Sequence, residues 1–246
     1  MTKDEKIAKL GKEITDRATV LLGKDKITPD APEYLGINSA LKFTAVKYDE
    51  KMADDILDIA LTMKKRVPLT IEQLAKKNPQ FDRAYLEKAL QALSESGLVE
   101  FHWENLDGKN PNHEKRWVLD MFVPGSAEIM MINPEQSDMF PETADFFERM
   151  AYLPLAGITE MVPPGGAGIG MHVIPVEKAI PAESKSLPIE HLSHWLKKYE
   201  GHIGVSVCSC RKQQRIRGEG SGDVEGEWCI GVGDFADYCR ETNHGR

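Results

Sequence analysis

The segment 70–103, TIEQLAKKNPQFDRAYLEKALQALSESGLVEFHW, determines the fold that we predict for the first half of this chain. Thr70 is followed three residues later by Gln73, which is the capping-box pattern at the start of a short helix. A second helix is predicted over Asp82–Ser96, where Gly97 is placed to end it, and a strand follows directly. The apolar face of this helix consists of Leu86, Ala89, Leu90 and Leu93.

Two amphipathic helices are predicted before this segment and one strand after it. Apolar residues recur at helical spacing in 4–22 and in 51–65, whereas the proline-containing stretch 23–50 is predicted to be a polar connection. Arg116–Leu119 is the returning strand of a hairpin with 98–103. Three helices followed by a hairpin is the winged-helix arrangement, a relative of helix-turn-helix.

We predict an α+β protein with three regions. These are a winged-helix-like domain at 1–122, a Pro-rich connecting region at 123–186 and a small mixed α/β cysteine domain at 187–246. In the connecting region we expect short strands at Met171–Ile174 and near Ile129, and a helix at 138–150. In the last region we expect a helix at 187–199 and a strand at 203–207 that ends just before the first cysteine.

Composition excludes several classes of protein. The chain has 246 residues and a net charge of −8, with 41% hydrophobic and 28% charged residues. This balance is typical of a soluble globular protein and argues against disorder, collagen and disulfide-rich secreted scaffolds. The charged start leads to no apolar signal region, and no apolar run approaches the roughly 20 residues of a spanning helix. We therefore predict a cytoplasmic protein with no membrane partner.

The winged-helix arrangement raises the question of DNA binding. Phosphate contacts need Lys and Arg, yet the helix that would enter the groove has a net charge of −1 and the whole chain is acidic. We therefore interpret this region as a protein-interaction or scaffold module and do not expect a nucleic-acid partner. The charged residues of that helix are Asp82, Arg83, Glu87, Lys88 and Glu95.

Two further motifs have structural explanations. The glycines of Pro163–Gly170 fit only part of a G-x-G-x-x-G fingerprint, because Met171 stands at the third glycine position, so we predict a flexible loop. His191 and His194 lie at i, i+3 on a predicted helix, and His202 follows. No carboxylate or cysteine in the immediate segment completes a metal site, so we expect these histidines to have packing or surface roles.

All four cysteines fall near the end of the chain, at Cys208, Cys210, Cys229 and Cys239. In a reducing compartment such residues are thiols, metal ligands or redox groups rather than a disulfide framework. The C-x-C pair places two sulfurs on one short turn, where they can bind one metal centre. We predict a metal site formed by these four residues. Their spacing leaves an iron–sulfur cluster and zinc open, although the paired C-x-x-C knuckles typical of zinc are absent.

A basic stretch accompanies the first two cysteines. Residues 208–218 contain Arg211, Lys212, Arg215 and Arg217 and no acid. Cations beside thiolates lower the pKa of the thiols and offset the negative charge of a thiolate-bound cluster. We therefore predict that Arg211, Lys212 and Arg215 contact or tune the cofactor.

Four segments carry a resemblance to a known family: VSVCSCRK at 205–212, RGEG at 217–220, CIGVGDFADY at 229–238 and the final Gly245–Arg246. They resemble the N-terminal iron–sulfur region of anaerobe pyridine-nucleotide-disulfide-type oxidoreductases, which depend on FAD and NAD(P), and of their ferredoxin-like relatives. The winged-helix-like segment and GMHVIPVEKAI at 170–180 also fit this family, and the resemblance covers roughly residues 35–246.

The resemblance implies that Cys208, Cys210 and Cys229 ligate an iron–sulfur cluster of the 4Fe–4S type. Relatives carry a further cysteine near the position of Ser221, so the fourth ligand stays open here. The alternatives are Cys239, a serine oxygen, a residue of another chain or a group beyond the last residue. In the family, FAD and NAD(P) bind in domains that follow this region, which places them in a further part of the chain or in a partner.

We therefore predict an iron–sulfur electron-transfer module or subunit of a larger flavin-dependent oxidoreductase, with no catalytic residues of its own. Its expected partners are flavoproteins and ferredoxin-type electron carriers, and an oligomer of identical chains is compatible with the sequence. Two other functions stay open: a redox- or metal-sensing winged-helix transcription regulator, and a structural zinc scaffold protein.

Overall fold

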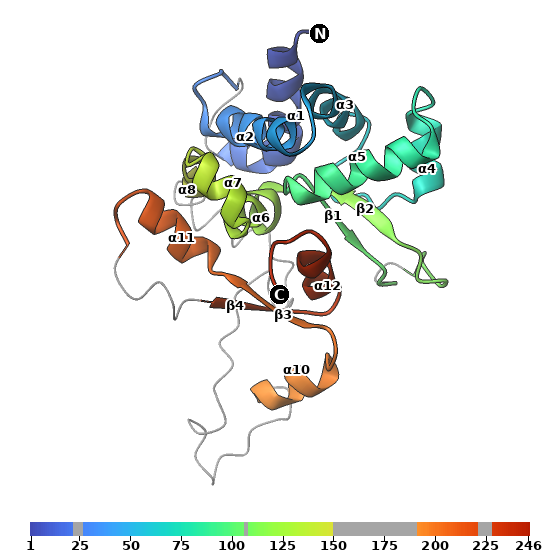
Figure 1. Ribbon diagram of the computed structural model, residues 1–246, viewed down its shortest axis with the longest axis vertical. Helices are drawn as coiled ribbons and strands as arrows, with labels where there is room; N and C mark the ends of the chain where they lie inside the picture. The colour runs from blue at the N-terminus through green and yellow to red at the C-terminus, as the bar shows by residue number, and fades with distance from the viewer. Residues whose placement is uncertain (22–26, 106–107, 150–190, 221–227) are drawn as a thin grey trace.

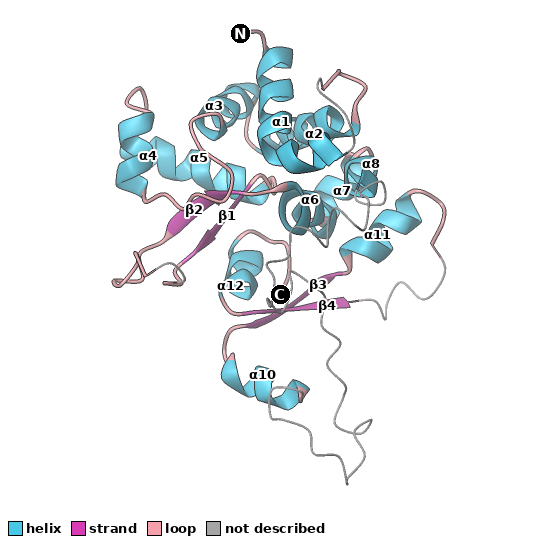
Figure 2. Cartoon of the chain, turned by 180° about the vertical axis from the view of Figure 1, so that it is seen from behind, coloured by secondary structure: helices cyan, strands magenta, loops and turns pink. Residues whose placement is uncertain are grey.

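The computed structural model describes residues 1–21, 27–105, 108–149, 191–220 and 228–246 as a mixed α+β protein. Helices make up most of the first 149 residues, and two small antiparallel sheets lie on one side of them (Figure 1). Helix α12 lies between the two sheets in both views (Figures 1 and 2). The elements are α1 (Lys3–Leu21), α2 (Pro32–Lys47), α3 (Glu50–Ala60), α4 (Ile71–Lys77), α5 (Arg83–Glu95), β1 (Val99–His102), β2 (Arg116–Leu119), a π-helical turn η1 (Phe122–Ser126), α6 (Ala127–Ile132), α7 (Pro134–Met139), α8 (Thr143–Glu148), α10 (Leu192–Lys198), β3 (Ile203–Val207), α11 (Ser209–Ile216), β4 (Trp228–Val232) and α12 (Asp234–Glu241).

The helix boundaries predicted in the segment 70–103 are confirmed. Thr70 and Gln73 form the full capping box of α4, with each side chain bonded to the other residue's backbone N–H. Asp82 caps α5 by accepting a 2.8 Å hydrogen bond from the N–H of Tyr85. Gly97 has a φ of 76°, and a Cβ built on it would lie 3.0 Å from the backbone nitrogen of Met130. Only glycine therefore allows both the turn after α5 and the close approach of α6.

The predicted hairpin is confirmed as an antiparallel pair of strands. Val99 lies opposite Leu119, and Phe101 lies opposite Trp117. Leu69, just before α4, forms an additional bridge to Trp117. The hairpin is thereby joined to the helices that precede it.

The expected polar connection at 23–50 is wrong for most of its length, because Pro32–Lys47 forms helix α2. Pro32 occupies the first turn, where its missing N–H costs nothing. This helix is buried on nearly all sides and therefore has no polar face from which a helical period could be recognised. Gly36 allows the ring of Phe146 in α8 to pack closely, since a Cβ there would come within 2.5 Å of that ring.

The strand expected near Ile129 is also wrong, because this run forms helix α6. The residues Ile129–Ile132 are all buried, and a short apolar run buried on every side has no period that separates helix from strand. The helix expected at 138–150 is shorter, as α8, and Pro141 precedes it rather than lying in its first turn. The predicted loop Pro163–Gly170 and strand Met171–Ile174 lie outside the described residues.

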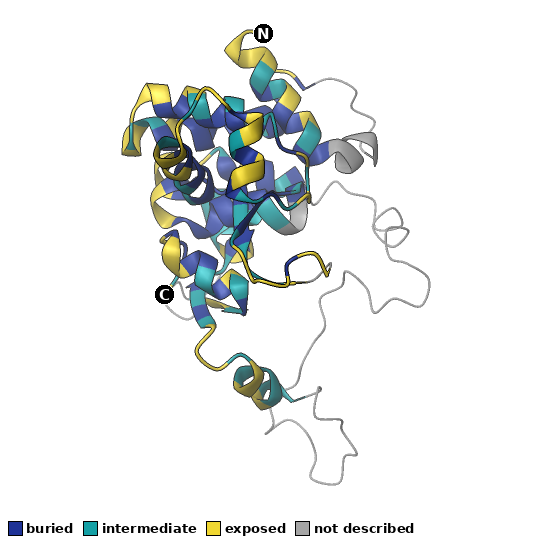
Figure 3. Ribbon diagram, turned by 90° about the vertical axis from the view of Figure 1, so that its right-hand side faces the viewer, coloured by how far each residue is buried: buried dark blue, intermediate teal, exposed yellow. Residues whose placement is uncertain are grey.

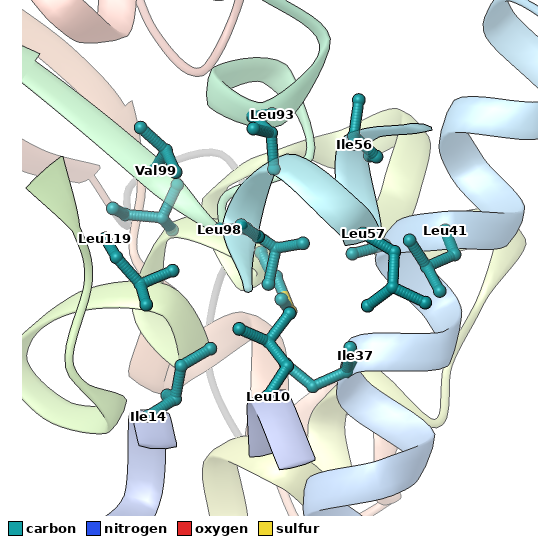
Figure 4. Packing of buried hydrophobic residues seen from close by; sticks show 14 of the residues in the cluster. Leu10, Ile14, Ile37, Leu41, Ile56, Leu57, Leu93, Leu98, Val99 and Leu119 are labelled. Carbon is teal, nitrogen blue, oxygen red and sulfur yellow. The ribbon is translucent and has the colours of Figure 1, made fainter. Parts of the chain in front are cut away.

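One hydrophobic cluster joins the two ends of the chain. Leu10, Ile37, Leu57, Leu98 and Leu119 meet where α1, α2, α3 and the hairpin come together (Figure 4). The cluster also includes the buried face of α12 from the predicted cysteine domain. The boundaries at 122 and 186 stay predictions, but residues from both sides of them share this core.

The second sheet pairs β3 with β4 in antiparallel register, and Arg246 bonds to Val205 at the other edge of β3. The predicted helix at 187–199 is described as α10, which has no buried residue (Figure 3). We expected Leu192, Leu196 and Tyr199, which lie at helical spacing, to face inward, but each of them is only partly buried. Instead, Trp195 stacks on Tyr199 within the same segment, at 6.5 Å between ring centroids. In the described part of the chain, no helix combines the length and apolar character that crossing a membrane requires.

Candidate metal centre

The pairing of β3 with β4 brings the first and third cysteines to one face of the sheet. Ser206 lies directly opposite Cys229. Because side chains alternate along a strand, Cys208, two residues after Ser206, points to the same face as Cys229. Cys208 is also the N-cap of α11, and Cys210 follows in the first turn of that helix. Three cysteines thus lie near one another where a strand ends and a helix begins.

The Cys208 thiol and the backbone N–H of Ser209 are polar neighbours of the Cys229 thiol. Partial burial raises the pKa of the Cys229 thiol to about 11, and the neighbouring Cys208 adds to this shift. Partial burial also raises the pKa of Cys210, again with a contribution from Cys208. These thiols are close enough that a negative charge on one disfavours ionisation of the next.

Cys239 has a different environment. It lies on α12, is 4% exposed and belongs to the hydrophobic cluster. Burial raises the pKa of its thiol to about 12, and the charge that adds to this shift comes from Glu100, on β1. The structure thus brings together Cys208, Cys210 and Cys229 and buries Cys239 in the core.

Two of the basic residues in and directly after α11 form ion pairs with acids of other helices. Lys212 pairs with Asp138 of α7, and Arg217 pairs with Asp145 of α8 at 2.6 Å. These pairs attach α11 to the helical body, so the positive charge predicted beside the thiols is partly balanced by acids (Figure 1). Arg211 is exposed and Arg215 is half-buried.

A cavity of about 400 Å³ lies beside Cys229. Its lining combines polar side chains near the thiols with the apolar residues Ile129, Ile132 and Phe235. Arg66 and Glu100 line this cavity and also a second one of about 610 Å³ that runs along the hairpin. The other polar residues lining the first cavity are Glu128, Ser206 and Ser209.

Asp120 carries a buried carboxylate near this cavity, and the sequence analysis did not single it out. Asp120 is fully buried, and neither of its oxygens has a hydrogen-bond partner in the described part of the chain. The nearest cation is Arg66, 3.6 Å away, whose backbone has a left-handed φ of 59°. Burial, reinforced by Glu100, raises the pKa of Asp120 well above its ordinary value. No sequence signal marks this residue, because its burial arises only from contacts between distant segments.

The three grouped thiols fit the chemistry of an iron–sulfur cluster or zinc, since soft thiolate ligands suit both. The N–H groups at the start of α11 add partial positive charge that favours thiolate. As the side chains stand, no three His, Cys, Asp or Glu residues in the described segments are arranged as a complete metal-ligand set. Metal binding would therefore require the thiols of Cys208 and Cys229 to reorient toward one shared metal centre.

The histidines have the following surroundings. His202 lies 2.6 Å from the carboxylate of Asp237, and His194 packs edge-on against Trp195. Their expected packing and surface roles agree with these contacts.

Comparisons of this chain with protein-family models, with curated proteins and with solved structures gave no match.

Proposed function

We propose that this chain is an iron–sulfur electron-transfer module or subunit of a flavin-dependent oxidoreductase. The observation that carries the proposal is the convergence of Cys208, Cys210 and Cys229 at the start of α11. When bound, such a cluster supplies one-electron transfer. FAD and NAD(P) would bind in a further part of the protein or in a flavoprotein partner.

The residues around the thiols have distinct roles in this proposal. Cys208, Cys210 and Cys229 are the ligands, and the Ser209 N–H lies beside the sulfur of Cys229. Ile129, Ile132 and Phe235 limit the access of water to that side of the site. Cys239 is not assigned as a ligand, because its burial in the core separates its thiol from the surface of the site.

The positive charge of α11 offsets the charge of the thiolates in this proposal. Arg211 and Arg215 supply it together with Lys212. The pairing of Lys212 with Asp138 makes its own contribution smaller than the sequence predicts.

We propose that the helices α3, α4 and α5 with the hairpin form a winged-helix-like docking module for protein partners. The single arginine of α5, Arg83, is paired with Glu72 at 3.1 Å and Glu87 at 3.0 Å. Phosphate contacts would have to break both pairs. This supports a protein partner rather than nucleic acid, and so favours electron transfer over a transcription regulator.

Anaerobic purification followed by analysis of iron, zinc and acid-labile sulfide tests the proposal. We expect iron and sulfide in similar amounts, with visible absorbance that dithionite bleaches. Single Cys→Ser variants at 208, 210 and 229 are expected to lose most of the iron, whereas the matched Cys239→Ala variant keeps it. Far-UV circular dichroism shows whether each variant folds.

Two outcomes would overturn these assignments. A colourless protein with full zinc occupancy would support the zinc scaffold instead. A folded Cys239→Ala variant that loses iron as completely as Cys210→Ser would show that Cys239 is a ligand.

A further inference from the structure

Cys208 follows the last residue of β3, and Cys229 in β4 lies opposite Ser206, so the two cysteines are diagonal neighbours at the end of the sheet. Because side chains alternate along a strand, both side chains lie on the same face, and the hydrogen bonds between the strands keep the two backbones near each other. The Cys208 thiol is a polar neighbour of the Cys229 thiol. Both residues are accessible, because Cys229 is exposed and Cys208 is half-buried. Diagonal side chains on one face of a sheet can reach each other, so a small movement of the backbone brings these two thiols to the geometry of a disulfide.

We infer that Cys208 and Cys229 form a redox-active dithiol that closes to an intramolecular disulfide on reaction with a small disulfide such as oxidised glutathione. One thiolate attacks the oxidant, whose S–S bond breaks, and a mixed disulfide forms with release of one glutathione thiol. The second cysteine then displaces the remaining glutathione, also as a thiol. The Cys208–Cys229 bond forms, the two protein thiols lose two electrons, and their protons end on the two glutathione molecules.

The other two cysteines are less suitable partners. Cys210 lies in the first turn of α11, two residues after Cys208, and residues two apart on a helix do not face each other. Cys239 is buried in the hydrophobic cluster, where a glutathione molecule has no access. The proximity of Cys208 to Cys229 therefore distinguishes one pair from all the others.

This inference does not rest on the proposed cluster, although it concerns two of the same sulfurs. A disulfide leaves neither sulfur as a thiolate, so oxidation and metal binding at Cys208 and Cys229 exclude each other. Metal-free protein isolates the redox chemistry, whereas iron and sulfide analysis of anaerobic protein tests the cluster. Failure of one proposal is thereby distinguishable from failure of the other.

The test uses the full chain, freed of metal by a chelator, in mixtures of reduced and oxidised glutathione. Free thiols are counted, and tryptic peptides are mapped by mass spectrometry without reduction. Trypsin places Cys208 and Cys210 in peptide 199–211 and Cys229 and Cys239 in peptide 218–240. We expect the thiol count to fall from four to two, with one link between these peptides and a mass loss of two hydrogen atoms.

Two matched double variants identify the pair, because each leaves only one cysteine in each peptide. The variant with Cys210→Ser and Cys239→Ala keeps Cys208 and Cys229. The variant with Cys208→Ser and Cys239→Ala keeps Cys210 and Cys229. In the same glutathione mixture, we expect the ratio of linked to unlinked protein to be at least about tenfold higher in the first variant.

Three results would overturn the inference. One is a wild-type protein that keeps four free thiols in the most oxidising mixture. The second is equal or greater linkage in the variant that keeps Cys210. The third is a product that runs as a covalent dimer in non-reducing electrophoresis. Where a double variant does not fold, the wild-type thiol count still tests whether two thiols are lost, and fragmentation of the linked wild-type peptides tests which two cysteines are joined.

Discussion

The hydroxyl of Tyr238 donates a 2.6 Å hydrogen bond to the backbone carbonyl of Ser94, 144 residues earlier in the chain. Tyr238 is fully buried on α12, and Ser94 lies in the last turn of α5. The ring of Tyr238 also packs edge-on against Phe101 of β1, at 5.1 Å between centroids. This one side chain therefore attaches the C-terminal helix to both a helix and a strand of the first half.

Replacing Tyr238 by Phe removes this bond while keeping the ring. We expect the free energy of unfolding to fall by about 1–2 kcal/mol, because a buried carbonyl loses a donor. Urea denaturation measures the change, with an unchanged m-value if the fold is kept. The matched variant Tyr85→Phe removes a hydroxyl bonded to Asp55 near the surface, and we expect it to cost less than about 0.5 kcal/mol. Equal losses in the two variants would contradict the role assigned to Tyr238.

Replacing Gly36 by Ala is expected to destabilise the protein although alanine favours helices. The added Cβ would lie 2.5 Å from the ring of Phe146, so α2 and α8 must move apart. Overpacking of this kind costs about 1–3 kcal/mol. Gly11→Ala in α1 is the control, since its Cβ would meet the flexible end of Ile27 at 3.3 Å and the backbone of Glu33 at an ordinary contact distance of 3.6 Å. Thermal denaturation of both variants should show a lower Tm for Gly36→Ala alone.

His244 should make stability fall on acidification. Its imidazole is buried and stacked on Tyr238, and burial, aided by the charge of Lys47, lowers its pKa to about 3. The unfolded chain binds a proton near the ordinary value of 6.5, so stability is present above that pH and is lost as the pH falls toward 3. We expect His244 to account for a loss of about 2 kcal/mol between roughly pH 7 and pH 5. The slope of stability against pH in this range should be smaller in His244→Phe; an equal slope would contradict the assignment.

Asp120 should make stability fall as the pH rises, which is opposite to the effect of His244. Its pKa is raised in the folded protein by burial and by Glu100, so the folded state holds a proton that the unfolded state releases. Stability from this group is present below its ordinary pKa and is lost as the pH rises through the raised value. The variant Asp120→Asn cannot ionise. Relative to wild type, it should therefore become progressively more stable as the pH rises from roughly 4 to 7. Urea denaturation at both pH values measures this difference, and a constant difference would contradict it.

Local signals in the sequence were sufficient where a residue acts on its own neighbours. The capping box of Thr70 and Gln73 and the glycine at 97 each act within a few residues, and both were predicted correctly. The hairpin was predicted correctly for the same reason, because its two strands follow each other closely in the chain.

Elements buried on all sides were predicted wrongly. Helix α2 was expected to be a connection and α6 a strand, because neither has a polar face that would reveal a helical period. Conversely, α10 has an apolar period but no buried residue. Periodicity indicates which side chains could be buried, but whether they are depends on what another segment brings to them.

The candidate site shows the same division. The sequence by itself determined that four cysteines and a basic stretch lie within one short C-terminal region, since these are matters of residue type and spacing. Only the tertiary structure decided that the register of β3 and β4 places Cys208 on the same face as Cys229, that Cys239 is buried on α12, and that Lys212 pairs with Asp138. The physical reason is that contact, burial and charge pairing depend on distances in space. Those distances are set by segments far apart in the chain, such as Ser94 and Tyr238, which are 144 residues apart.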